Sequence, residues 1–260
     1  MMSSWDKIVS LLENYFSTFL NGVAATLILA IVGTIVGLGI GILIAPARNL
    51  RVRKNDRLPL KILKRSVSAL SAIYVNFFRG TPMMVQAMII FFGFTSMGFS
   101  WTDIQLGWIF NGYMICGLFV ITINTGAYMS EIVRAGLNGV DVGQEEASRS
   151  LGMNYFQTMF GIVMPQALKN ALPAILNEYI VNIKDSSVLN VIGLTELYAS
   201  VSIATNKNYF KVEGYIIIAI IYLILTLLAT LVLKLISRRL NGRKGFVRPF
   251  RHRIKEAVSS

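Results

Sequence analysis

The chain has 260 residues, of which 54% are hydrophobic and only 15% are charged, and its formal net charge is +12. Such a composition is typical of an integral membrane protein. The single cysteine, Cys116, excludes a disulfide framework and a cysteine metal site, and the single histidine, His252, excludes a zinc centre or histidine-based catalysis. We therefore expect no metal site and no catalytic residues.

Long apolar segments predict where the chain crosses the membrane. A helix needs about 20 mostly apolar residues to span the hydrocarbon core. Five segments meet or approach this requirement, at 16–45, 69–96, 107–134, 168–190 and 214–236. We expect the first to stay in the mature chain, because it is too long for a signal-peptide core. It carries Gly33, Gly37 and Gly41, a spacing typical of close helix packing.

The basic residues predict the orientation of these spans. Eight Lys or Arg lie between Arg48 and Arg65, and nine more lie between Lys234 and Lys255. Cations that flank spans mark the cytoplasmic side, so we expect the N-terminus outside and a basic tail, 237–260, in the cytoplasm. A polybasic contact with lipid is an equally simple interpretation of these clusters. We expect no contact with nucleic acid.

The second span contains an interruption at Arg79, Gly80, Thr81 and Pro82. Thr81 as a cap and Pro82 at the first helical position would start a new helix there. Free backbone N–H groups and a helix N-terminus then favour a carboxylate. Arg79, Gly80 and Thr81 are therefore candidates to bind the carboxylate of a substrate. Alternatively, Arg79 is a structural or interface residue.

Near the cytoplasmic end of the third span, Glu131 and Arg134 are spaced for a structural ion pair. A short exposed helix is then predicted over 141–152. Asp141 would cap it with Gln144 as the reciprocal partner, Glu145 and Glu146 suit its first turn, and Gly152 would end it. About two turns of helix are unstable alone in water, so we expect a partner to hold this one.

The fourth span carries ionisable residues, which are costly in a membrane and usually line a pathway. Glu178, Asn182 and Asp185 follow i, i+4, i+7 spacing and so share one helical face. We expect them to face the amino group or a cationic side chain of a substrate, with Asp185 as the strongest candidate. Alternatively, Lys184 and Asp185 tie helices together.

The cytoplasmic segment resembles the motif of bacterial ATP-binding-cassette (ABC) importer permeases: Glu-Ala-Ala, three residues, Gly, nine residues, Ile-x-Leu-Pro. The matching residues are Glu146, Ala147, Ser148, Gly152, Ile162, Met164 and Pro165. Ser148 and Met164 are conservative departures. Four longer blocks are similar to the polar amino acid branch of that family: YVNFFRGTPMMVQ, EIVRAGLNGVDVGQEEASRSLGM, MPQALKNALPAILNEY and NIKDSSVLNVIGLTEL.

The resemblance implies an all-α fold of the type I ABC importer permease, with residues 1–260 as one membrane domain. It implies that 141–152 is a coupling helix that contacts an ATPase dimer. The residues that would form this contact are Gly143, Glu145, Glu146, Ala147, Ser148, Gly152 and Pro165. Further implied partners are a second permease subunit and an extracellular amino-acid-binding protein. No GxxxxGK[ST] loop occurs in the sequence, so we expect ATP to bind to the partner and no cofactor to bind to this chain.

Two other functions remain as alternatives. A secondary transporter or channel would need no ATPase, but such transporters ordinarily show two related halves in one chain. A membrane enzyme would need a convergent catalytic set, for which only Asp and Glu residues are available. We therefore predict a non-catalytic permease subunit for a polar amino acid. Asp185 favours a basic or amide side chain on that substrate.

Overall fold

The computed structural model describes residues 3–50, 57–107 and 110–240. Within these ranges the regular secondary structure is helical, and the helices are joined by turns and loops that include an isolated β-bridge between Gln105 and Asn111. The elements are α1 (Ser4–Arg48), α2 (Leu58–Gly80), α3 (Met83–Ser96), η1 (Trp101–Asp103), α4 (Gly112–Asn138), α5 (Val142–Ser150), α6 (Tyr155–Thr158), the π-helical η2 (Met159–Val163), α7 (Met164–Asp185), η3 (Ser186–Ile192), α8 (Leu197–Asn208) and α9 (Lys211–Leu240). The expected all-α membrane fold is confirmed. Most of the predicted basic tail 237–260 lies outside the described residues.

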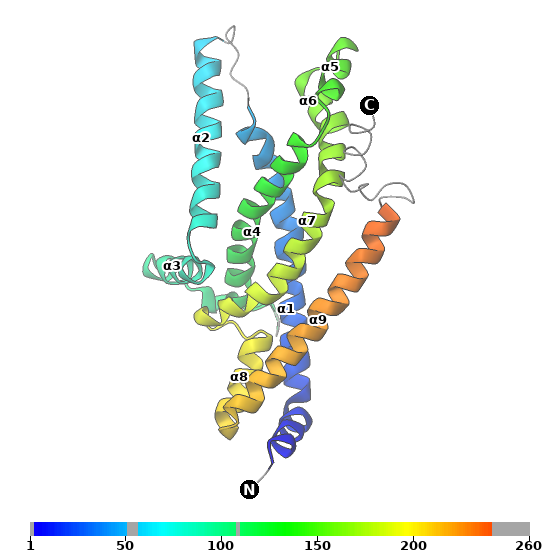
Figure 1. The fold of residues 1–260 in the computed structure, drawn as a ribbon. Coiled ribbons are helices and arrows are strands. Elements are labelled where there is room, and N and C mark those ends of the chain that lie inside the picture. Colours follow the sequence, from blue (N-terminus) through cyan, green and yellow to red (C-terminus); the bar gives the residue numbers. More distant parts are fainter. Residues whose placement is uncertain (1–2, 51–56, 108–109, 241–260) are drawn as a thin grey trace.

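Among the described residues, four helical segments are long and apolar enough to cross a membrane by themselves: Ser4–Arg48, Gly112–Asn138, Tyr155–Ile192 and Lys211–Ser237. A fifth crossing requires α2 and α3 together, and these two helices meet at an angle of 108°. The predicted second span, 69–96, thus consists of parts of two helices that meet at the predicted interruption. α2 begins at Leu58, well before residue 69, and α3 lies crosswise to it (Figure 1).

The centre of the fold is the contact between α1 and α4, which run side by side (Figure 1). Glycines on α1 make this contact close. A Cβ atom at Gly37 would lie 2.8 Å from Thr125 Cγ2, and one at Gly41 would lie 2.7 Å from Met129 Cβ. The predicted packing role of Gly33, Gly37 and Gly41 is thus confirmed, because larger side chains would force the helices apart.

The two ends of the molecule are built from different elements (Figure 1). The start of α1 lies near α8 and the start of α9, and there Lys7 Nζ lies 3.0 Å from Glu213 Oε1. α5, α6 and the start of α2 lie at the opposite end. Because α1 has 45 residues, and about 20 suffice to cross the hydrocarbon core, part of α1 extends beyond the membrane.

Glu196 fastens α8 to its neighbours and is fully buried, with 0% exposure. Its carboxylate accepts hydrogen bonds from the backbone N–H groups of Tyr198 and Ala199, which begin α8. It also accepts from the hydroxyls of Thr26 on α1, at 3.3 Å, and Tyr222 on α9, at 2.7 Å. Four donors satisfy a buried carboxylate that has no cationic partner in the described part of the chain.

Candidate functional site

The break between α2 and α3 is held by buried amide side chains. The Gln86 amide nitrogen donates to the backbone oxygens of Phe78 and Thr81 and to the Thr81 hydroxyl, at 2.7 to 2.9 Å. Asn124 on α4 donates to the Phe78 oxygen and to Gln86 Oε1. These bonds satisfy backbone groups that the end of a helix leaves free.

The predicted capping at this break is wrong. Thr81 ends α2 instead of beginning α3, and its hydroxyl donates to the Phe77 oxygen at 2.8 Å. Pro82 takes the position before α3, where its side chain offers no hydrogen bond. Sequence reasoning missed Gln86 as the residue that holds the break, although a polar residue inside an apolar helix was a usable signal.

Arg79 closes the last turn of α2 and faces α4. Its Nη1 lies 3.7 Å from Glu131 Oε1, and its guanidinium lies 5.4 Å from the Tyr128 ring centroid. Arg48 and Arg134 contact the same Glu131 carboxylate, so the predicted Glu131–Arg134 pair is confirmed. Beside the break, a Cβ atom at Gly80 would meet nothing within 4 Å.

The three residues of α7 that are predicted to contact the substrate, Glu178, Asn182 and Asp185, occupy different surroundings. Asn182 is buried, donates to the Thr34 hydroxyl of α1 at 2.9 Å, and accepts from the Thr125 hydroxyl of α4 at 2.9 Å. Glu178 and Asp185 are half-buried. Within the described part of the chain, neither carboxylate forms an ion pair or a side-chain hydrogen bond.

The two predicted poles of the substrate site lie on different helices that both pack against α1 and α4. α2 packs mainly against α1 and α4, whereas α7 packs mainly against α4, α1 and α9 (Figure 1). The segments that directly follow the poles do meet, because α3 packs against η3. Met83 at the start of α3 belongs to the same apolar cluster as Leu189 and Ile192 of η3.

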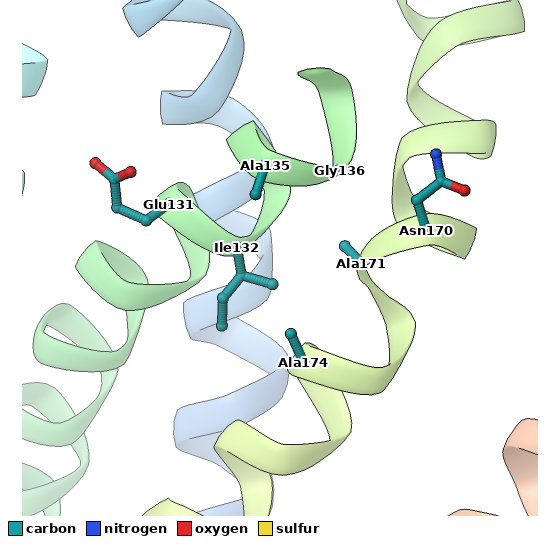
Figure 2. Close-up of a pocket in the computed structure, with 7 residues that line it drawn as sticks. All are labelled: Glu131, Ile132, Ala135, Gly136, Asn170, Ala171 and Ala174. Carbon is teal, nitrogen blue, oxygen red and sulfur yellow. The ribbon is translucent and has the colours of Figure 1, made fainter. Parts of the chain in front are cut away.

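A hollow of about 460 Å³ lies between α4 and α7. Small side chains dominate its lining, which consists of Glu131, Ile132, Ala135, Gly136, Asn170, Ala171 and Ala174 (Figure 2). In this view the carboxylate of Glu131 points away from α7. None of the predicted substrate residues lines the hollow.

The predicted helix over 141–152 is α5, and its two ends are capped. Asp141 Oδ1 accepts from the Gly143 N–H at 2.7 Å. After α5 the N–H groups of Gly152 and Met153 donate back to the oxygens of Arg149 and Ser148, and Gly152 has φ of +79°. This is the Schellman arrangement, which favours glycine.

The reciprocal capping role predicted for Gln144 is wrong, since its side chain accepts a hydrogen bond from Gln166 Nε2 at 3.1 Å. That bond fastens α5 to the start of α7. Ser148 is buried, and its hydroxyl donates a hydrogen bond to the backbone oxygen of Gln144. The residues exposed or half-buried on and beside α5 include charged, small and apolar ones, among them Val142, Gly143, Glu145, Glu146, Ala147, Leu151, Gly152, Phe156 and Pro165.

Comparison with known families shows to which family the chain belongs. Residues 61–242 match the model of the family described as "Binding-protein-dependent transport system inner membrane component". The chain belongs to this family. The matched segment contains the α2–α3 break, α5 and α7, which are the elements that carry all the candidate residues.

Curated relatives in this family are amino acid permeases. The arginine transport system permease protein ArtQ of Bacillus subtilis (strain 168) is 34% identical, over 86% of this chain and 92% of that protein. The nopaline transport system permease protein NocM of Agrobacterium fabrum is 31% identical, over 90% of this chain and 92% of that protein. This inner-membrane component is thus the permease component of an ABC amino acid importer.

Solved permeases share its fold. A crystal structure of an amino acid ABC transporter with histidines superimposes with a TM-score of 0.72 at 34% identity, covering 88% of this chain and 96% of that one. An inward-facing structure of the MetNI methionine ABC transporter gives a TM-score of 0.63 at 20% identity, over 92% and 99% of the two chains. The permease architecture expected from the sequence is confirmed.

Proposed function

We propose that this permease imports a polar amino acid by alternating access and that a separate ATPase drives it through α5. The observation that carries the substrate part is the pair of carboxylates on α7, Glu178 and Asp185, which lack partners within the described residues. Ionisable groups at membrane depth are costly unless they serve a pathway. An ammonium or guanidinium group of the substrate would supply the missing charge.

The relatives favour the same chemistry. Their names refer to arginine and nopaline, and the solved transporter carries histidines. We infer a substrate with a basic or amide side chain, whose cationic group faces Asp185 and Glu178. Its carboxylate would face the α2–α3 break at Arg79, Gly80 and Thr81. The packing of α3 against η3 supports this arrangement because it brings together the segments that follow the two poles.

The surface of α5 supports the ATPase part of the proposal. Large apolar side chains beside α5 are open to solvent, with exposures of 82% for Leu151 and 70% for Phe156. A protruding helix with apolar residues around it suits insertion into a partner protein. The full assembly would contain a permease dimer, two ATPase subunits that bind the ATP, and an extracellular amino-acid-binding protein. This places α5 in the cytoplasm and the start of α1 outside.

The alternative is a secondary transporter or channel that works without an ATPase. A reconstitution experiment separates the two. The tagged chain is purified with any copurifying ATPase and, separately, alone, and both preparations are placed in liposomes with the binding protein. Uptake of radiolabelled L-arginine and L-glutamine is measured with and without ATP on the ATPase side. We expect uptake only with ATP and the ATPase, whereas full uptake by the chain alone would overturn the proposal.

A further inference from the structure

Three residues on one face of α4 contact the end of α2. Asn124, Tyr128 and Glu131 follow i, i+4, i+7 spacing and therefore form a continuous stripe along the helix. We call these three residues the α4 stripe. Asn124 contacts Phe78, whereas Tyr128 and Glu131 contact Arg79, and both of these residues lie in the last turn of α2.

The contacts of the α4 stripe differ in kind, but all of them are made with the last turn of α2. Asn124 Nδ2 donates to the Phe78 backbone oxygen at 3.1 Å. The Tyr128 ring lies 5.4 Å from the guanidinium of Arg79, and Glu131 Oε1 lies 3.7 Å from its Nη1. A hydrogen bond, a cation–π contact and an ion pair together fix both the backbone and the side chain at the end of α2.

Glu131 is the central charge of this arrangement. Three guanidiniums approach its one carboxylate, from Arg48 at the end of α1, Arg79 at the end of α2 and Arg134 on α4. The Glu131 side chain is only 18% exposed, so water screens this cluster incompletely. Without the carboxylate, the three cations would repel one another and α2 would lose its ionic link to α4.

The C-terminal end of α4, which follows shortly after Glu131, leads directly into α5. α4 ends at Asn138 and α5 begins at Val142, so only residues 139–141 separate the two helices. Gly136 holds this end of α4 against α7, because a Cβ atom there would lie 2.4 Å from the Ala167 oxygen. A displacement of α5 would therefore move α4, and with it the α4 stripe.

We infer that the α4 stripe transmits the movement of α5 to the α2–α3 break, and that Glu131 is the positioning residue of this linkage. The inference rests on the proposed function, because it assumes that an ATPase moves α5. When α4 shifts, Arg79 and the backbone of Phe78 follow, so the residues proposed to receive the substrate carboxylate change position. Hydrolysis in the separate ATPase is thereby coupled to the substrate site through contacts within this permease subunit.

The test measures amino acid transported per ATP hydrolysed, using the complete complex in liposomes with L-arginine as the probe. Glu131→Gln keeps the shape of the side chain but removes its charge. We expect ATP hydrolysis to continue while the transport ratio falls at least about fivefold, the lower limit of ordinary coupling between sites. Tyr128→Leu weakens the same stripe without unpairing a charge, and we expect its ratio to fall in the same direction.

The matched control is Glu213→Gln. It removes the ion pair between Lys7 on α1 and Glu213 on α9, which lies far from the α4 stripe. Loss of stability alone lowers transport and hydrolysis together, so the control should keep the wild-type ratio. A wild-type ratio in both Glu131→Gln and Tyr128→Leu would overturn the inference. Absence of ATP-driven uptake in the wild-type complex would instead overturn the proposed function, so the two failures are distinguishable.

Discussion

Thr125 on α4 donates its hydroxyl proton to the amide oxygen of Asn182 on α7 at 2.9 Å, and both residues are buried. Asn182 in turn donates to Thr34 on α1. One amide therefore joins three helices in the interior, where an unpaired polar group is expensive. The residue that the sequence assigns to the substrate path has its polar atoms engaged in holding the bundle together.

Replacement of Asn182 by Ala should destabilise the permease. The change leaves the hydroxyls of Thr34 and Thr125 without partners, at a cost of about 1–3 kcal/mol. Thermal unfolding in detergent measures the effect, and Asn177→Ala, at an exposed position of α7, is the matched control. If Asn182→Ala kept wild-type stability but bound substrate more weakly, Asn182 would belong to the substrate path instead.

The α1–α4 contact predicts that two glycine substitutions on α1 differ in their effect on stability. A Cβ atom at Gly41 would lie 2.7 Å from backbone and side-chain atoms of Met129, whereas one at Gly39 would meet nothing within 4 Å. Gly41→Ala should therefore cost about 1–3 kcal/mol through overpacking, and Gly39→Ala should not destabilise. Unfolding of both variants in detergent checks this, and equal stabilities would contradict the packing assigned to α1.

Glu196 supplies a prediction about the end of the molecule formed by α8. Glu196→Ala removes the acceptor for four hydrogen bonds, so we expect a loss of about 3 kcal/mol or more. Tyr222→Phe removes one of those bonds and should cost about 1 kcal/mol. The midpoint of denaturant unfolding compares the two variants. A larger loss in Tyr222→Phe than in Glu196→Ala would show that the carboxylate is not the centre of this network.

Asp185→Asn tests the proposed cationic pole. Loss of a charge-assisted contact should raise the KM for L-arginine about tenfold. The KM for L-glutamine, whose side chain is neutral, should rise less. Uptake by the reconstituted complex gives both values. Equal increases for the two substrates would mean that Asp185 does not touch the cationic side chain.

Local signals in the sequence predicted several parts of the fold correctly. Gly33, Gly37 and Gly41 predict a close helix contact because helix spacing alone places them on one face, whereas the partner helix, α4, is known only from the structure. Asp141 and Gly152 predict the limits of α5 because caps depend on neighbouring residues. The interruption near Pro82 was also visible, since Pro cannot continue the hydrogen bonding of a helix.

The remaining features depend on tertiary contacts that no local pattern encodes. The angle of 108° after α2 follows from the bonds of Gln86 and Asn124, which lie 38 residues apart. The ion-pair partners of Glu131 come from α1 and α2 as well as from its own helix. Helical spacing correctly put Asn182 on the face of Glu178, but it could not show that Thr34 and Thr125 already engage it.

Site-specific crosslinking tests the central claim, that α5 carries movement from an ATPase into this permease, most directly. A photoreactive amino acid replaces Glu146, which is exposed on α5, or Tyr209, which is 87% exposed beside α8 at the opposite end. The assembled transporter is then irradiated in membranes, and its products are identified by mass spectrometry. The account predicts an ATPase adduct from position 146 and none from position 209. An ATPase adduct from position 209, with none from position 146, would contradict it.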